Sequence, residues 1–178
     1  MADVQRVLHD YIPPRAYDVK GSVSIINAGD LLFYNSTYQG ISQQTVQGAG
    51  AGSAGNSAAN ARFQFANLFV GVSHDRHDVR PTNDQILVSV DAEIDIPLAN
   101  STGVATAATA EIGPGAKVGV AVDGNFVPIA DKIVVDGAHS VTVADNEAIG
   151  RTSRVVRPNE KLVRVHIKGL HVMSQVGI

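Results

Sequence analysis

The sequence predicts an all-β protein, a small β-barrel or sandwich built as a meander of short antiparallel strands. Apolar and polar residues alternate from Ile86 to Leu98 and again from Leu162 to Lys168. This period of two is expected of strands that bury one face. Asp-Gly pairs at positions 123–124 and 136–137 are strong hairpin signals. Many short strands separated by turn signals are typical of sandwiches and barrels.

The turn signals place the individual hairpins. The first Asp-Gly pair predicts a hairpin between Val118–Val122 and Asn125–Ile129. The second predicts one between Lys132–Val135 and His139–Val143. A third is expected at the turn signal 27–30, between a strand-like run from Val19 and the residues Leu31-Leu32-Phe33-Tyr34.

The N-terminal segment predicts a short helix over residues 3–11, with Asp3 as its N-cap. Four apolar side chains recur at helical spacing, namely Val4, Val7, Leu8 and Tyr11. Pro13 and Pro14 end the helix. A helix this short is marginal in water, so it must dock, either on its own domain or on a neighbour. We therefore predict a docking arm over residues 1–18, followed by a single β-rich domain over residues 19–178.

Residues 47–60 are small, uncharged and rich in Gly and Ala, which predicts a long flexible loop because they bury too little area to offset their ordering entropy. A phosphate cradle is the alternative, but the run lacks the Gly-Lys-Ser/Thr ending of a P-loop. Residues 60–68 offer the one further helical pattern. A second soft loop is expected over residues 99–110.

Composition excludes several function classes. The 178 residues are 44% hydrophobic, enough for a packed core, and only 17% are charged, against about 25% in an average domain. This low charge suggests that partners cover part of the surface. The net charge of −3 gives no basic field for nucleic acid. The absence of Cys excludes disulfides and thiolate metal sites. Neither a secretory signal nor an apolar run of ~18 residues is present, so no membrane association is expected.

The run His74-Asp75-Arg76-His77-Asp78 contains residue types that bind metals. Its two histidines are three residues apart in a region without helical pattern, and Arg76 between them disfavours a dication. We predict a polar loop without a functional metal or cofactor. A hydrolase using His74, Asp75 and His77 is the third-ranked alternative for function.

Asp91, Glu93 and Asp95 share one face of the predicted strand, about 7 Å apart at ~3.4 Å per residue. Glycosidases use paired carboxylates at such separations, but a chain that is 5% aromatic and lacks Trp is poorly suited to bind sugars. We expect a solvated or salt-bridged face, either opposite the outward residues of the last strand or against a neighbouring subunit. Those outward residues are Arg164, His166 and Lys168. No esterase elbow, zinc-protease motif or dinucleotide fingerprint occurs, so we predict no enzymatic activity.

Five segments in order carry a family resemblance: Phe69–Arg76, Ile86–Glu93, Ile112–Ala121, Ala148–Arg151 and Val163–Ile167. Their glycines and strands resemble the small β-rich capsid decoration proteins of tailed phages, also called cement or head-stabilising proteins. In that family a Gly-Val strand precedes a Val-Gly-Val-Ala strand, an Ile-Gly-Arg/Lys turn and a final strand. The resemblance covers about residues 65–168.

The resemblance implies a non-enzymatic virion protein, made in the host cytoplasm, that binds the outer surface of a phage-type capsid. Its partner would be the major capsid protein, and it would form a homo-oligomer, with a trimer favoured. It implies neither a cofactor nor nucleic-acid binding. A small-ligand-binding β-barrel is the runner-up function. The candidate capsid or subunit contacts are Val4, Val7, Leu8, Tyr11, Asp91, Glu93, Asp95, Arg164 and Lys168.

Overall fold

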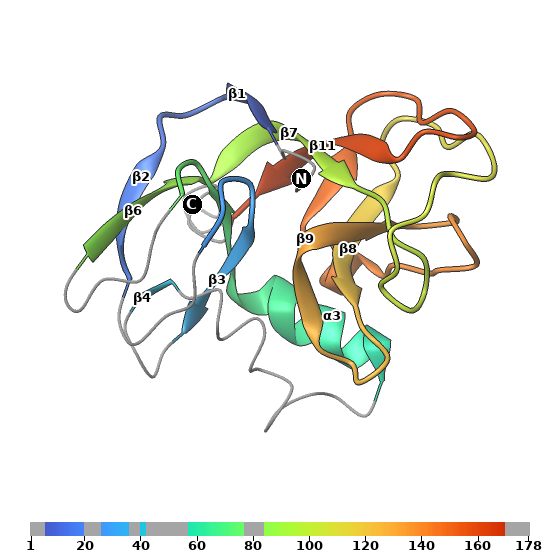
Figure 1. Cartoon of the computed structure of the whole chain (residues 1–178), viewed down its shortest axis with the longest axis horizontal. Coiled ribbons are helices and arrows are strands. Elements are labelled where there is room, and N and C mark those ends of the chain that lie inside the picture. Colours follow the sequence, from blue (N-terminus) through green and yellow to red (C-terminus); the bar gives the residue numbers. More distant parts are fainter. Residues whose placement is uncertain (1–5, 20–25, 36–39, 42–56, 77–83, 170–178) are drawn as a thin grey trace.

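The computed structural model describes residues 6–19, 26–35, 40–41, 57–76 and 84–169, which form two antiparallel sheets (Figure 1). In spatial order, the six-stranded sheet contains β1 (Arg6–Asp10), β7 (Asp91–Pro97), β11 (Leu162–Lys168), β10 (Gly150–Thr152), β8 (Lys117–Val122) and β9 (Pro128–Val135). The five-stranded sheet contains β2 (Arg15–Val19), β6 (Asp84–Ser89), β5 (Phe69–Ser73), β3 (Leu31–Asn35) and β4 (Gly40–Ile41). One α-helix, α3 (Ala58–Leu68), and a 3₁₀ turn, η1 (Asp145–Glu147), complete the described elements. The all-β class is confirmed.

The main core combines the inner face of the six-stranded sheet with β3, β5 and α3. In β7 and β11, every second side chain points into it. These are Ala92, Ile94, Ile96, Val163, Val165 and Ile167, each at most 1% exposed. Burial of an aliphatic side chain contributes roughly 1.5–3 kcal/mol, so the alternation fixes which face of each strand looks outward. The last strand has the bounds and faces that its sequence predicts.

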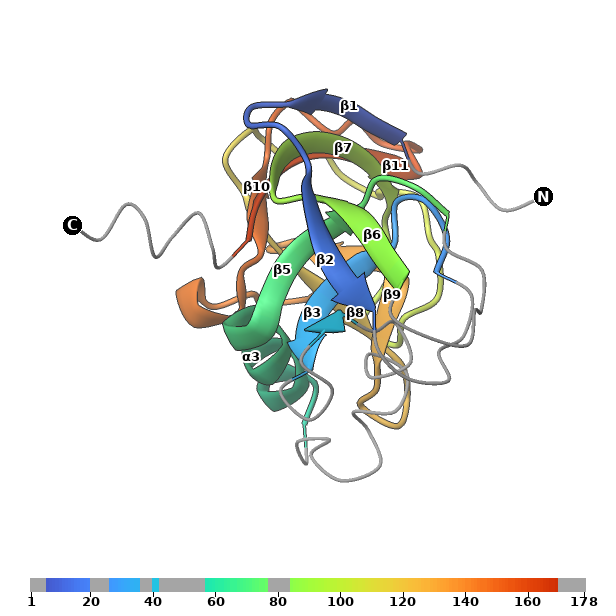
Figure 2. The ribbon, with the colours of Figure 1, turned by 90° about the vertical axis from the view of Figure 1, so that its left-hand side faces the viewer.

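The alternating run 86–98 is two strands rather than one. β6 belongs to the five-stranded sheet and β7 to the six-stranded sheet, with a bend at Val90 between them. Val88, Ser89 and Val90 are buried in succession, which interrupts the alternation where the chain passes from one sheet to the other. Figure 2 shows this passage, with β6 and β7 following each other around the edge of the molecule.

The predicted N-terminal helix is wrong for the described residues, because Arg6–Asp10 is the strand β1 at the edge of the six-stranded sheet. It pairs antiparallel with β7, with a bulge between Val7 and His9. The outer backbone groups of β7 require hydrogen-bond partners, and a short isolated helix offers them none. After Pro13 and Pro14 the chain forms β2, which pairs with β6 in the other sheet. The described part of the predicted arm therefore lies on its own domain.

The helix expected near residues 60–68 is confirmed, and it begins earlier, at Ala58. Ser57 caps it, since its hydroxyl accepts a hydrogen bond from the Asn60 backbone N–H at 3.2 Å. Residues 57–60, predicted as loop, thus belong to the cap and first turn, and residues 47–56 lie outside the described residues. Phe65 faces the core, where its ring contacts Phe33 and Phe69 at centroid distances of 5.5 and 5.8 Å.

One predicted hairpin is confirmed and one is wrong. β8 and β9 form the first, closed by Asp123, whose carboxylate accepts hydrogen bonds from the backbone of Asn125 and Val127. Beyond β9, residues 136–140 form successive turns, and residues 141–143 form no strand. Val141 and Val143 there cover the outer side of β8 and β9 in a small apolar cluster, which is why the segment folds over the sheet. Of the third predicted hairpin, the turn at 27–30 and the following strand β3 are present. Most of the strand-like run from Val19 that precedes the turn lies outside the described residues.

A buried ion pair joins α3 to the segment between β9 and β10. Arg62 Nε donates to Glu147 Oε2 at 2.7 Å, and Arg62 Nη2 donates to the Thr142 carbonyl at 3.2 Å. Both side chains are about nine-tenths buried. A Cβ added at Gly119 would lie 2.9 Å from Arg62 Cδ, so glycine at this position of β8 leaves room for the arginine.

Replacing Glu147 with Ala should lower the free energy of unfolding by roughly 3–5 kcal/mol, because the Arg62 charge would remain buried without its partner. The matched control is Asp145→Ala, which removes an exposed carboxylate 3.7 Å from Lys117 Nζ and should change stability by less than about 1 kcal/mol. Urea denaturation of both variants measures the difference. Equal losses of unfolding free energy in the two variants would contradict a larger contribution from the buried pair of Arg62 and Glu147.

Candidate functional site

The outward side of the six-stranded sheet bears a row of ionisable residues, one from each of five neighbouring strands. The pairing registers place His9 opposite Glu93, Glu93 opposite His166, His166 opposite Arg151, and Arg151 opposite Lys117. We call the outward residues around this row the ionic face. Its members are His9, Asp91, Glu93, Asp95, Lys117, Arg151, Arg164, His166 and Lys168.

The acidic residues of β7 and the basic residues of β11 lie opposite each other, which is one of the two arrangements that the sequence left open. Arg164 donates two hydrogen bonds to Asp95, at 3.1 and 3.2 Å. The Asp95 carboxylate raises the pKa of Arg164, first by this hydrogen bonding and then by its charge. Asp91 faces Lys168 in register, but it accepts its hydrogen bond from His166 Nε2 at 2.6 Å.

The N-terminal strand adds aromatic rings to this face. Tyr11 is half exposed, and its ring lies against His166 at 4.6 Å and against His9 at 4.8 Å between centroids. Val7 instead packs against the core. Of the other candidate contacts, Val4 lies outside the described residues and the Leu8 side chain is not described. Tyr11 is thus the one candidate contact of the N-terminal segment that is placed on the ionic face.

The histidine cluster is only partly described, since His77 and Asp78 lie outside the described residues. His74, Asp75 and Arg76 are exposed at the end of β5. His74 Nδ1 lies 3.8 Å from Asp10 Oδ2 and 3.4 Å from Ser89 Oγ. In the described ranges, no group of three or more His, Cys, Asp or Glu side chains is arranged to hold a metal ion.

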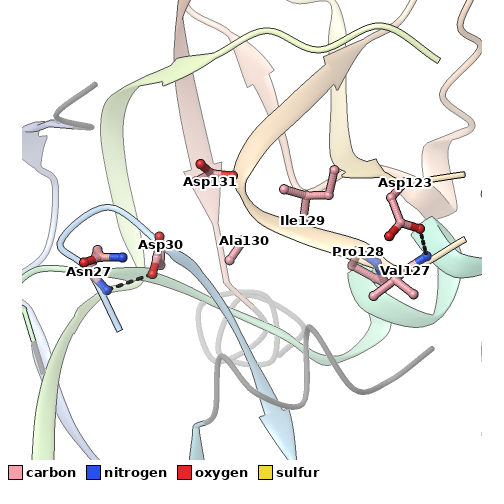
Figure 3. A pocket seen from close by; sticks show the side chains of 8 residues that line it. All are labelled: Asn27, Asp30, Asp123, Val127, Pro128, Ile129, Ala130 and Asp131. Carbon is pink, nitrogen blue, oxygen red and sulfur yellow. Dashed lines mark hydrogen bonds between the residues drawn. The ribbon is translucent and has the colours of Figure 1, made fainter. Parts of the chain in front are cut away.

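A pocket of about 410 Å³ lies on another part of the molecule, where sequence reasoning predicted no site. It gathers Asn27 and Asp30 from the turn before β3, Asp123 and Val127 from the β8–β9 hairpin, and residues 128–131 of β9. Figure 3 shows the carboxylates of Asp30 and Asp123 at opposite ends of the pocket. The turn at 27–30 and the stretch 123–131 are far apart in sequence, so no local pattern indicates the pocket.

Asp30 is the most buried carboxylate in this pocket, at 2% exposure. The Asn27 backbone N–H donates to its Oδ2 at 2.8 Å. Burial raises the pKa of Asp30 to about 6, and the nearby Asp131 charge adds to the effect, while the hydrogen bonds from Asn27 oppose it. A buried carboxylate with a raised pKa inside a pocket is typical of functional sites, and near pH 6 it both donates and accepts hydrogen bonds.

The comparisons with known proteins identify no relative: the chain matches no family model and no curated protein. Within the described part of the chain, no helix is long and apolar enough to cross a membrane.

Replacing Asp91 with Asn should change the free energy of unfolding by no more than about 1 kcal/mol, since the amide oxygen still accepts the hydrogen bond from His166 and a partly exposed pair contributes little. Thermal denaturation beside Asp145→Asn, a control at an exposed carboxylate of the same sheet face, measures the effect. A loss of several kcal/mol would mean that Asp91 belongs to a buried carboxylate network.

Replacing Asp30 with Asn should stabilise the protein more at pH 7.5 than at pH 4. The pKa of Asp is close to 3.9 in an unfolded chain and about 6 here, so folding disfavours the ionised form. The free energy of unfolding therefore falls as pH rises from about 4 to about 6, by up to about 3 kcal/mol at about 1.4 kcal/mol per pKa unit. Asn removes this dependence.

Urea titrations at the two pH values, with Asp145→Asn as the control, test this pH dependence. A stability difference between Asp30→Asn and the native chain that is the same at pH 4 and pH 7.5 would show that Asp30 titrates normally.

Proposed function

We propose that this chain is a non-enzymatic structural protein that binds the outer surface of a phage-type capsid and stabilises or decorates it. The observation that carries the proposal is the ionic face. Its charges lie in register on a hydrogen-bonded sheet, so their spacing is set by the strands, about 4.8 Å apart. A partner with complementary charges fits such a face in one register, which suits repeated binding to the identical subunits of a lattice.

The pairing of charges within the face also suits protein binding. Arg164 neutralises Asp95, and Asp91 accepts a hydrogen bond from His166, so a partner that covers these carboxylates does not bury them without partners. The aromatic ring of Tyr11 beside them is the kind of side chain that is enriched in interfaces.

The glycines that carry the family resemblance have structural reasons in this fold. Gly119 leaves room for the buried Arg62. At Gly150 an added Cβ would lie 2.4 Å from the His166 carbonyl oxygen, so only glycine permits this approach of β10 to β11. These glycines serve packing rather than phosphate binding or catalysis, which agrees with a structural role. In the proposal the partner is the major capsid protein, and the chain acts as a homo-oligomer, with a trimer favoured.

A small-ligand-binding protein is the second candidate function, and the Asp30 pocket favours it. Val127, Pro128 and Ile129 give the pocket an apolar wall, and Asp30 gives it a polar anchor from a distant segment. Ligand sites of this size commonly combine an apolar wall with polar groups that orient the ligand, and here Asn27, Asp123 and Asp131 add further polar groups beside Asp30.

Purified capsid particles from the source of this sequence should contain the chain at a fixed copy number relative to the major capsid protein. Quantitative mass spectrometry of gradient-purified particles measures this ratio. The recombinant chain should also co-sediment with particles stripped of it. A chain that is abundant in the lysate but absent from the particles, and that does not co-sediment, would contradict the proposal.

A further inference from the structure

We infer that the hollow between β10 and β11 binds a carboxylate, and that it takes an acidic side chain of the partner protein. This inference rests on the proposed function, because it specifies the chemistry of the surface that the ionic face contacts. The hollow has a volume of about 310 Å³ and is lined by Ala148, Ile149, Gly150, Arg151, His166 and Lys168.

The hollow exists because small residues stand between long basic ones. Ala148 and Gly150 carry little or no side chain, while Arg151, His166 and Lys168 extend around them. Gly150 cannot be enlarged without displacing the backbone of β11. The Lys168 backbone N–H also donates to the Ile149 carbonyl at 3.3 Å. Rigid backbone therefore sets the distance between the basic side chains, which favours a preorganised site.

Two of the basic side chains are held in place by the protein itself. Arg151 Nη1 donates to the Gly115 carbonyl at 2.9 Å, which fixes the guanidinium while other N–H groups stay available. His166 is held by Asp91 at Nε2 and by the ring of Tyr11. Its Nδ1 has no hydrogen-bond partner among the described residues. Both side chains are thus oriented before a ligand arrives.

Lys168 supplies the charge that is not neutralised. It is exposed, and within the described ranges it forms no ion pair or side-chain hydrogen bond, although Asp91 lies opposite it in register. The nearest anion to Arg151 is Asp145, at 3.9 Å from Nη2, and its side chain is 87% exposed. Such a long, solvated contact neutralises little. The hollow therefore has an excess of positive charge.

A carboxylate fits this arrangement better than a larger or more highly charged group. Arginine binds carboxylates through two parallel hydrogen bonds, and Lys168 adds a third donor from the neighbouring strand. The acidic residues Asp91, Glu93 and Asp95 on the adjacent β7 repel a long polyanion such as a nucleic acid. A single Asp or Glu side chain that projects from a protein surface contacts the three donors without approaching β7.

The test uses the full-length protein and a blocked serine peptide that contains a single glutamate. In amide NMR spectra, the peptide should shift the signals of residues 150–151 and 166–168, and 0.5 M NaCl should weaken the effect by screening. Lys168→Gln and Arg151→Gln should each weaken binding at least tenfold. The matched control is Lys132→Gln, which removes a lysine already paired with Asp131 at 2.8 Å on β9, and it should bind like the native chain.

Four results would overturn the inference. In the first, the glutamate peptide causes no shifts at these residues. In the second, Lys168→Gln binds as tightly as the Lys132→Gln control. In the third, an oligothymidine binds at the same residues more tightly than the peptide, which would make nucleic acid the occupant. In the fourth, the same serine peptide with glutamine in place of glutamate, which should cause no shifts, causes shifts of equal size.

Co-sedimentation with capsids separates this inference from the proposed function. If the peptide binds as expected but native protein does not bind capsids, the carboxylate site stands and the capsid role fails. If native protein and Lys168→Gln bind capsids equally well, the capsid role stands and the hollow is not the contact.

Discussion

The packing of this protein depends on the buried pair of Arg62 and Glu147. The pair joins the only described α-helix to the segment that leads into β10, and it does so from inside the fold. α3 continues directly into β5 of one sheet, while the segment after Glu147 continues into β10 of the other. The pair therefore links a helix that is continuous with one sheet to a segment that is continuous with the other. Gly119 is required for the same reason, because the arginine stem passes beside β8.

The ionic face follows from that packing. Once the inner side chains of β7 and β11 occupy the core, their alternate side chains point outward in register, and opposite charges on the two strands meet. β10 extends the row because Gly150 lets it approach β11 closely. The same approach leaves the hollow beside Lys168. A binding surface thus arises from the alternation of the strands and one glycine, without a dedicated loop.

Sequence patterns predicted the features that depend on neighbouring residues. They failed where contacts between distant segments determine the structure. The bounds and faces of β11 follow from seven alternating residues, whereas the charges of β7 and β11 left open whether the two strands lie opposite each other or each meets a neighbouring subunit. The alternation of residues 86–98 continues through Val90, so it gave little sign that the chain changes sheets there. Val4, Val7, Leu8 and Tyr11 fit a helical spacing, yet the edge of β7 pairs with Arg6–Asp10 as a strand. The Asp30 pocket was missed because two segments remote in sequence form it.

The continuity of β6 and β7 has a mechanical consequence. These strands are consecutive in the chain, and each is hydrogen-bonded into a different sheet. A tangential force on the outward side of β7 therefore reaches the other sheet through covalent bonds at Val90, and not only through side-chain packing. Within each sheet, the neighbouring strands that lie along the direction of the force share the load. Sheets joined in this way resist sliding past each other when the outer surface is pulled along its own plane.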